Sequence, residues 1–487
     1  MAMKRVATLS LFVAAVVFIV HHEATPRAQG AQGPVTFSEH VAPIVFANCA
    51  PCHRPGEAAP FSLLSYRDAR PLAKAIASVT ASHVMPPWKA GPSDYAFANA
   101  RQLSADQIAT IQRWVADGAL EGDPARLPAL PRFTEGWQLG PPDLVVSMSD
   151  AFEVPARGPD VYRNFAVPLN LDRDRWVRAL EFRPSARTVV HHSLFFLDTT
   201  SASRERDASD PLPGFPGGMG GGRVGGSGRG LAGLLRGRGA ADSVDDDPVA
   251  RVAGGLGGWA LGGRALELPT GLAFFVAKGS DLVLSTHFHP SGKIEHEQST
   301  VGLYFASSPP TQAFTTIQLP PIFGVFEGLD IPPDEGHYTI KDAFVLPIDV
   351  RAFSVGAHAH YLGKQMRLTA TLPDGAVKTL LRIDDWDFSW QERYRFAEFV
   401  SLPKGTRLDA EVSYDNTPAN KRNPSHPPVR VTWGEESTDE MGSVGLQVVA
   451  ASPSELPQLR EAIVAHIRQA AVTRPGLGQL LRRRQAR

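Results

Sequence analysis

The sequence predicts a multidomain protein in which one small all-α domain precedes two all-β sandwiches. The length of 487 residues exceeds what one hydrophobic core supports and suggests about three domains of roughly 150 residues each. Apolar residues recur at helical spacing only in the first part of the chain, up to about residue 125. From Gly136 onward, short alternating segments are punctuated by glycine and proline, as is typical of antiparallel sandwiches.

The N-terminus has the layout of a secretory signal. Lys4 and Arg5 precede an apolar run from Val6 to Val20, and small residues before Ala31 offer a cleavage site. We therefore expect residues 1–30 to be a signal peptide and the mature protein to be periplasmic or secreted, without stable membrane insertion. An uncleaved anchor is the alternative, although the apolar run is short for a bilayer span.

The charge balance argues against a nucleic-acid partner. The formal net charge is −1, so the chain has no bulk attraction for nucleic acid or anionic lipid.

Residues 35–125 form the predicted helical domain, and it holds both cysteines of the chain. Three segments have helical apolar spacing, the last one capped by Ser104. Cys49, Cys52 and His53 form a C-x-x-C-H motif, in which two thiols attach one haem c and the histidine ligates its iron. A redox dithiol or half of a zinc site is the alternative, but no second cysteine pair exists.

This region resembles a small bacterial cytochrome c from about Val35 to Asp123. The resemblance implies a second iron ligand from a later loop, where Met85 stands before two prolines. His83 is the weaker candidate. The domain is expected to transfer single electrons.

The β region divides into two sandwiches near residues 309–314. Nine alternating segments are predicted as strands, starting at residues 163, 176, 188, 281, 299, 353, 365, 407 and 442. We assign residues 143–310 to the first sandwich and residues 311–452 to the second. Residues 211–263 are so rich in glycine that most of them are expected to form a mobile surface insertion. Residues 453–487 are expected to be a helical tail with a basic end, whose apolar stripe docks on a sandwich.

Histidine pairs on predicted strands suggest metal sites. Six of the fifteen histidines form three close pairs: His191 with His192, His287 with His289, and His358 with His360. A single strand histidine is usually an ordinary hydrogen-bonded residue, but three pairs are hard to explain in that way. Imidazole without nearby cysteine suits copper, zinc, iron or nickel, and the thioether of Met441 favours copper that cycles through Cu(I).

Four ordered motifs resemble the copper type II, ascorbate-dependent monooxygenases, the family of the peptidylglycine α-hydroxylating and dopamine β-monooxygenases. They are "VHHSLFF", "LSTHFHPSG", "AHAHYLGK" and "EESTDEMGSVGLQV", within about Asp143 to Val449. The resemblance implies two jelly-roll-like sandwiches that each hold one copper beside an open, watery cleft. It makes His191, His192 and His287 ligands of the electron-transfer copper. His358, His360 and Met441 become the ligands of the catalytic, oxygen-binding copper.

Strand geometry conflicts with one part of this assignment. Adjacent strand residues point to opposite faces, so His191 and His192 can share a metal only if the strand bends or ends there. Geometry alone would pair His287 with His289. We follow the resemblance for His287 and expect His289 to lie outside the ligand set.

The implied reaction is hydroxylation of a C–H bond of a small-molecule substrate with O2, at the cost of two electrons. Those electrons would come from an external donor, either an ascorbate-like reductant or a redox protein, and we hypothesise that the haem relays them to the copper of the first sandwich. The peptide-hydroxylating members have a substrate-gripping arginine and tyrosine where this chain has Gly356 and Gly445, so a peptide substrate is not expected. The alternative is a periplasmic electron-transfer or copper-carrying haem protein without oxygenase activity.

Overall fold

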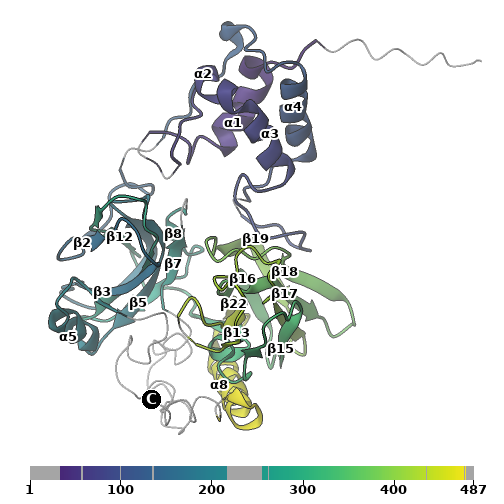
Figure 1. Cartoon of the computed structure of the whole chain (residues 1–487). Helices are drawn as coiled ribbons and strands as arrows, with labels where there is room; N and C mark the ends of the chain where they lie inside the picture. The colour runs from purple at the N-terminus through teal and green to yellow at the C-terminus, as the bar shows by residue number, and fades with distance from the viewer. Residues whose placement is uncertain are drawn as a thin grey trace, which may run out of the picture.

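The computed structural model describes residues 33–216, 255–476 and 478, apart from residues 56, 58, 99, 134–135, 261–262 and 435. The predicted signal peptide, most of the glycine-rich insertion and the basic end of the tail lie outside these residues. Figure 1 shows a helical region followed by two bodies of β-structure that stand beside each other.

The N-terminal region is helical in the three predicted segments. Its elements are η1 (Phe37–Val41), α1 (Ala42–Asn48), α2 (Tyr66–Ala69), η2 (Arg70–Leu72), α3 (Ala73–Ala81), α4 (Ala105–Ala116) and η3 (Pro124–Arg126). The predicted cap of α4 is confirmed, because Ser104 and Gln107 form a reciprocal capping box. Phe37, Ile111 and Trp114 are fully buried in the core of these helices.

The first sandwich contains strands β1 to β12 and one helix. The elements are β1 (Leu144–Ser147), β2 (Phe152–Val154), β3 (Val161–Pro168), β4 (Arg175–Arg183), β5 (Val190–Asp198), α5 (Ala202–Ser209), β6 (Phe215–Pro216), β7 (Gly257–Ala260), β8 (Leu266–Glu267), β9 (Phe274–Val276), β10 (Asp281–Phe288), β11 (Glu295–Glu297) and β12 (Thr300–Phe305).

Two five-stranded sheets make up most of this sandwich. One has the order β1-β12-β4-β8, with β9 also paired to β4, and the other has the order β6-β3-β10-β5-β7. Strand β10 is buried along its whole length between β3 and β5. The two ends of the predicted insertion are ordered as β6 and β7, which add the outer strands of the second of these sheets.

The second sandwich contains strands β13 to β22. Its elements are β13 (Phe314–Leu319), η4 (Pro321–Gly324), β14 (Asp330–Ile331), β15 (Tyr338–Val345), β16 (Val350–Ala359), β17 (Gly363–Thr371), β18 (Val377–Ile383), β19 (Arg393–Leu402), β20 (Arg407–Tyr414), β21 (Val431–Thr432) and β22 (Gly442–Ala450). Its main sheets have the orders β13-β22-β16-β19 and β15-β20-β17-β18.

The C-terminal tail is helical, as predicted, and packs on this sandwich. After η5 (Pro453–Glu455), helix α8 (Leu456–Thr473) buries Leu459, Ile463 and Ile467 in the same core as the two main sheets. The amphipathic stripe of the tail therefore belongs to the second hydrophobic core.

The three regions contact one another through side chains and backbone. A small buried cluster joins Leu268 and Leu272 of the first sandwich to Phe353 and Val449 of the second. Residues 88–102, which link α3 to α4, form backbone bridges to the second sandwich at Ile383 and Phe396.

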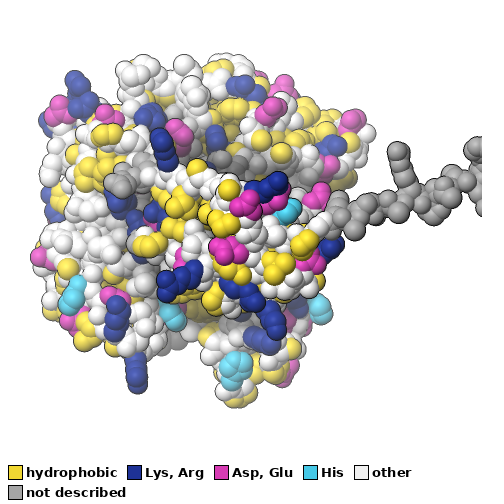
Figure 2. All heavy atoms as spheres, turned by 90° about the horizontal axis from the view of Figure 1, so that it is seen from above, with side chains coloured by type: hydrophobic (Ala, Val, Ile, Leu, Met, Phe, Trp, Pro, Cys, Tyr) yellow, Lys and Arg dark blue, Asp and Glu magenta, His cyan; other side chains and the backbone are white. Residues whose placement is uncertain are grey.

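None of the described helices combines the length and hydrophobicity that crossing a bilayer requires. Acidic, basic and apolar side chains are interspersed on the face seen from above, in keeping with the small net charge (Figure 2).

Candidate metal centres

A β-bulge in β5 brings three predicted ligands of the first sandwich together. His287 on β10 lies opposite His192 on β5, but the next residue of β10, Phe288, lies opposite Val190. His191 is therefore the extra residue of the bulge, which breaks the alternation of side chains along the strand. His191 and His192 can share a metal only if the strand bends there, and this bulge provides the bend.

The three imidazoles of this first cluster lie close enough to share one ion. One nitrogen from each of His191, His192 and His287 lies within 4.8 Å of the others. The ring centroids of His191 and His192 are each 4.9 Å from that of His287. Tyr162 stacks on His287 at 4.3 Å and fixes the plane of its ring.

The donor atoms of the first cluster fit a metal ion. The Nδ1 atoms of His191, His192 and His287 are buried, and none of them has a hydrogen-bond partner among the described residues. A buried polar atom without a partner is costly, and three together are best explained by a shared ligand.

The protonation states also suit metal binding. Burial lowers the pKa of His191 to about 4, with a further decrease from the neighbouring His287, and it lowers the pKa of His192 well below the ordinary value. Burial also lowers the pKa of His287, against the opposing effect of Asp160. The three imidazoles are therefore uncharged at neutral pH, and each can offer a nitrogen lone pair to a metal ion.

His289 is not part of this nitrogen cluster. Its Nδ1 atom is 2.8 Å from Asp160 Oδ1, and its side chain is 65% exposed. The other oxygen of Asp160, Oδ2, is 2.7 Å from His287 Nε2. A carboxylate that binds the second nitrogen of a histidine in this way orients the ring toward a metal.

The second cluster forms where β16 ends and β22 begins. In the antiparallel register His358 lies opposite Ser443 and Ala359 opposite Gly442, so His360 follows the end of β16 where Met441 precedes the start of β22. The rings of His358 and His360 are 5.3 Å apart, and Met441 is 1% exposed. At Gly442 an added Cβ would collide with the hydroxyl of Tyr414, which explains why glycine follows the methionine.

In the second cluster, the Nδ1 atoms of His358 and His360 are both engaged in hydrogen bonds. His358 Nδ1 is 2.5 Å from Gln391 Oε1, and His360 Nδ1 is 3.1 Å from the carbonyl oxygen of Asp439. His358 Nε2 is buried without a hydrogen-bond partner in the described chain, so this atom is the donor that fits a metal. Burial lowers the pKa of His358 to about 4 and that of His360 to about 3.

A buried carboxyl group, whose pKa burial raises to about 8, fixes the backbone around the second cluster. Glu440 accepts hydrogen bonds from the amides of His360 at 3.0 Å, Leu362 at 2.6 Å and Met441 at 3.1 Å. It therefore positions the backbone of two predicted ligands from different strands.

One aromatic ring separates the two clusters. The ring of Phe388 lies 5.7 Å from those of His192 and His287 and 5.3 Å from that of His360. Phe388 is itself 3% exposed. The resemblance implied an open, watery cleft, whereas here an apolar side chain fills the space directly between the two sets of imidazoles.

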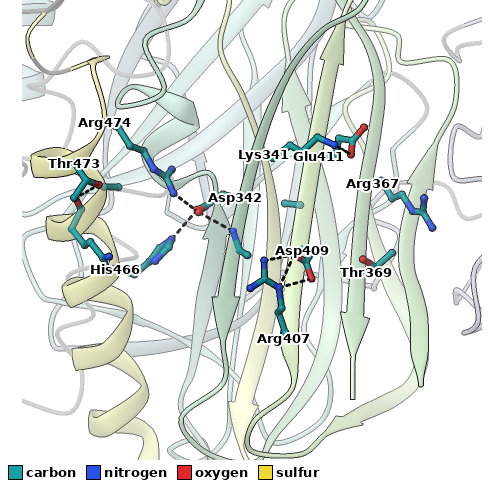
Figure 3. Close-up of a pocket in the computed structure, with 14 residues that line it drawn as sticks. Lys341, Asp342, Arg367, Thr369, Arg407, Asp409, Glu411, His466, Thr473 and Arg474 are labelled. Carbon is teal, nitrogen blue, oxygen red and sulfur yellow. Dashed lines mark hydrogen bonds and ion pairs between the residues drawn. The ribbon is translucent and has the colours of Figure 1, made fainter. Parts of the chain in front are cut away.

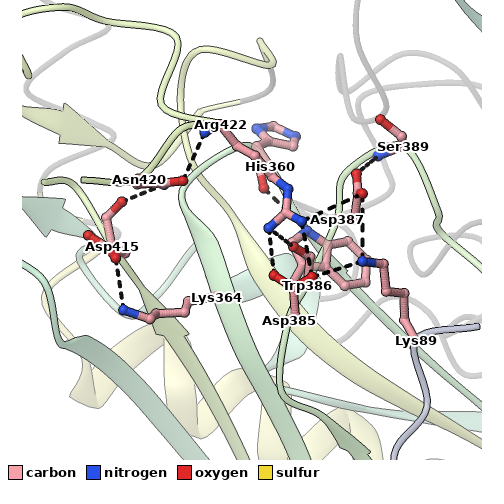
Figure 4. A network of polar contacts seen from close by, with 10 residues as sticks. All are labelled: Lys89, His360, Lys364, Asp385, Trp386, Asp387, Ser389, Asp415, Asn420 and Arg422. Atoms are coloured by element: carbon pink, nitrogen blue, oxygen red, sulfur yellow. Dashed lines mark hydrogen bonds and ion pairs between the residues drawn. The ribbon is translucent and has the colours of Figure 1, made fainter. Parts of the chain in front are cut away.

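The segment that carries Phe388 is tethered on both sides. Asp385 pairs with Lys89 at 2.9 Å and with Arg422 at 2.7 Å, and Trp386 donates its indole N–H to the carbonyl of His360 at 3.2 Å (Figure 4). The hydrogen bond from Arg422, followed by the Lys89 interactions, lowers the pKa of Asp385 to about 2. Lys89 belongs to the segment between α3 and α4, so this tether connects the helical region to the second cluster.

The C-x-x-C-H residues follow directly on α1. Cys49 caps the end of α1, and its carbonyl oxygen accepts the amides of Cys52 at 3.1 Å and His53 at 2.9 Å. Neither cysteine forms a disulfide, and burial raises the pKa of Cys49 to about 12. Phe61 packs on the His53 ring at 4.5 Å and is 43% exposed. Two unbridged thiols three residues apart, followed by a histidine, are the groups that a covalently attached haem c requires.

The predicted second iron ligand lies in the turn after α3. The amide of Met85 is bonded to the carbonyl of Val79 at 3.1 Å, and its side chain is half-buried. The alternative, His83, is exposed and has a positive φ of 55°.

A separate cavity of about 680 Å³ lies between α8 and strands β15, β17 and β20 (Figure 3). Its charged groups pair with one another: Asp342 bonds His466 at 2.8 Å and also Arg474, and Arg407 pairs with Asp409. None of the predicted site residues lines it.

Several residues that position the clusters were not predicted from the sequence. Glu440 and Tyr361 are chain neighbours of predicted ligands, and that adjacency was the available signal. Asp160, Phe388 and Gln391 come from loops distant in sequence, and no local pattern marks them.

Comparison with known proteins gives limited similarity. No protein-family model matches the chain. It is 24% identical over 194 residues to "DBH-like monooxygenase protein 1" of Gallus gallus, a match that covers 37% of this chain and 30% of that protein. This similarity suggests the dopamine β-monooxygenase-like family and a monooxygenase, or oxidoreductase, type of function.

Solved structures give no further guidance. The VP2 subviral particle of infectious bursal disease virus aligns over 68% of this chain and 76% of its own, at 11% identity and a TM-score of 0.19. A second capsid structure, of the Gx strain, has a TM-score of 0.17. Scores this low support no argument about fold or function.

Proposed function

We propose that the chain is a copper-dependent monooxygenase that hydroxylates a C–H bond of a small molecule. One atom of O2 enters the product and the other becomes water, with two electrons and two protons consumed. The observation that most supports this proposal is the convergence of His191, His192 and His287, which bring one nitrogen each within 4.8 Å of the others and each have a buried, unpartnered Nδ1 atom.

In this proposal each sandwich holds one copper ion. His191, His192 and His287 bind one ion, and His358, His360 and Met441 bind the other. Copper would supply one-electron redox chemistry and O2 activation. The buried imidazoles stay neutral and available as donors, and the thioether of Met441 favours the reduced ion. Phe388 excludes water from the space between the two sets of ligands.

The face next to the second cluster supports a substrate other than a peptide. Gly356 lies directly opposite Gly445, two residues along from His358 and Ser443 in the same register. Because opposite residues and residues two apart share one face of a sheet, these glycines add no side chain beside His358. The space over them is bordered by Arg393, opposite Gly356, and Gln318, opposite Gly445. We propose that the body of the substrate packs on these glycines.

We also propose that the helical domain carries haem c on Cys49, Cys52 and His53, with Met85 as second ligand, and relays electrons from an external donor. Support comes from the loop after the motif, where Glu57 pairs with Arg187, four residues before His191. In a rapid-mixing experiment, protein with reduced haem is combined with protein that holds Cu(II). If the relay exists, the haem should be reoxidised within the turnover time. Persistent reduced haem would rule out the relay. Export to the periplasm or the medium remains a proposal that rests on residues 1–30 alone.

Metal analysis tests the central proposal. We expect two coppers per chain in the native protein, and one after His358→Ala. Oxygen uptake coupled to product formation should be lost in Met441→Ile while the haem spectrum is retained. Fewer than two coppers per haem, or no oxygen uptake with any reductant, would favour the electron-transfer or copper-carrying alternative.

A further inference from the structure

One carboxylate receives hydrogen bonds from both sandwiches. Asp160 lies directly before β3 of the first sandwich, and its Oδ2 atom accepts the hydroxyl of Tyr361 from the second sandwich at 2.6 Å. The same oxygen is 2.7 Å from His287 Nε2, and Oδ1 is 2.8 Å from His289 Nδ1. The side chain of Asp160 is only 15% exposed, so water competes weakly for these bonds.

On the first sandwich, Asp160 determines which nitrogen of His287 faces the cluster. The N–H at Nε2 donates to the carboxylate, and Nδ1 is left as the unpartnered donor beside His191 and His192. Burial would raise the pKa of Asp160, but the hydrogen bonds from His287, Tyr361 and His289 hold it below the ordinary value. The carboxylate is therefore ionised and able to orient the imidazole.

On the second sandwich, the partner of Asp160 is the chain neighbour of a predicted ligand. Tyr361 follows His360 directly, and its ring lies 4.9 Å from Phe388. Burial and the bond to Asp160 both raise the pKa of Tyr361, so its hydroxyl stays a donor. A continuous path of contacts thus runs from His287 through Asp160 and Tyr361 to His360.

We propose that Asp160 is a positioning residue shared by the two metal centres and that, through Tyr361, it couples metal binding at one centre to affinity at the other. This inference rests on the proposed function, because it assumes that both clusters bind copper. A metal ion that reorients either His287 or His360 shifts a hydrogen bond on the common carboxylate. By linkage, the effect on affinity is equal in both directions.

A double-mutant cycle on the full chain tests the coupling. The affinity of the first centre for Cu(II) is measured by chelator competition, with its occupancy identified by electron paramagnetic resonance, in the wild type, His358→Ala, Tyr361→Phe and the double variant. We expect His358→Ala to change that affinity about fivefold with Tyr361 present, and by a factor close to one in the Tyr361→Phe background. Equal ratios in both backgrounds would overturn the coupling.

A measurement without metal separates this inference from the proposed function. In the copper-free protein, Tyr361→Phe should increase backbone amide exchange around Asp160 and His287 about tenfold. Tyr338→Phe is the matched control, since its oxygen bonds Asp330 of the same sandwich. If the wild type binds no copper, the proposed function fails. If amide exchange in Tyr361→Phe equals that of the wild type, whether or not copper binds, then the hydrogen bond between Tyr361 and Asp160 does not connect the two centres.

Discussion

The two clusters of candidate ligands are built by different means. The first cluster uses neighbouring strands of one sheet, and its local order comes from a bulge at His191 and from Asp160. The second lies at strand ends and depends on loop residues, because Gln391, the Asp439 carbonyl and Glu440 fix its histidines and backbone. The comparison indicates that the first centre is set mainly by sheet register, whereas the second is sensitive to loops and to the helical region tethered to them.

The largest expected effect is loss of the first centre on His287→Ala. Removing one of three nitrogens should lower the copper content from two ions per chain to one, because the remaining pair provides no third donor. His296→Ala, on the exposed position of β11, is the matched control and should retain both ions. Elemental analysis decides, and two coppers in His287→Ala would disprove the assignment of this cluster.

Glu440→Gln should damage the second centre selectively. The amide group cannot accept all three backbone N–H bonds and places a donor against buried donors, so we expect the free energy of unfolding to fall by about 1–3 kcal/mol. Copper affinity should drop strongly at the second centre, and at the first only by the smaller change that the Asp160–Tyr361 coupling transmits. Chemical denaturation and site-resolved paramagnetic resonance measure the two effects. An equal loss at both centres would contradict the assignment of Glu440 to the second centre.

The stability of the copper-free protein should depend on pH in the acid range. His191 and His358 have pKa values near 4 in the folded state, against 6.5 for an ordinary histidine. Between these values the unfolded chain binds more protons than the folded one, so the free energy of unfolding should rise with pH from about 4 to about 6.5. Denaturant titrations measure this slope, which His358→Gln should reduce. A slope identical in the variant would contradict the burial of this neutral ring.

The smallest effect is expected from releasing the Phe388 segment. Lys89→Met removes a partner of Asp385, while Arg422 still holds that carboxylate. Copper affinity at the second centre should fall about twofold to fivefold, with a smaller change at the first. Lys341→Met, which breaks an exposed pair with Glu411, is the control. A larger loss of copper affinity at the first centre than at the second would contradict the view that the second centre depends more on its loops.

Periodicity and spacing predicted the helical segments and nine of the 22 strands of the described chain. All nine predicted strands are present, as are the helical segments and the Ser104 cap, because alternation and capping are local signals. Thirteen other strands of the described chain were not predicted, among them the long strands β15 and β19, whose burial does alternate. The short strands β6 and β7 carry no such local signal, because their stability comes from pairing with β3 and β5 rather than from their glycine- and proline-rich sequence.

The candidate ligands were easier to predict than their supports. Histidine pairs stand out locally, and the need for a bend at His191 followed from strand geometry. Asp160 and Phe388 act across the interface between sandwiches, where contacts join residues far apart in the chain. No periodic pattern encodes such a contact, and the expectation of an open cleft between the centres came from resemblance rather than from these residues.

Because of the bulge at His191, the number of nitrogen donors at the first centre depends on the number of residues in β5. Deleting one residue from β5 next to the bulge would restore regular alternation and turn one of the two adjacent imidazoles to the opposite face, without replacing any ligand. A single codon lost or gained could thus convert a three-nitrogen centre into a two-nitrogen one, a route of divergence that substitution alone does not offer.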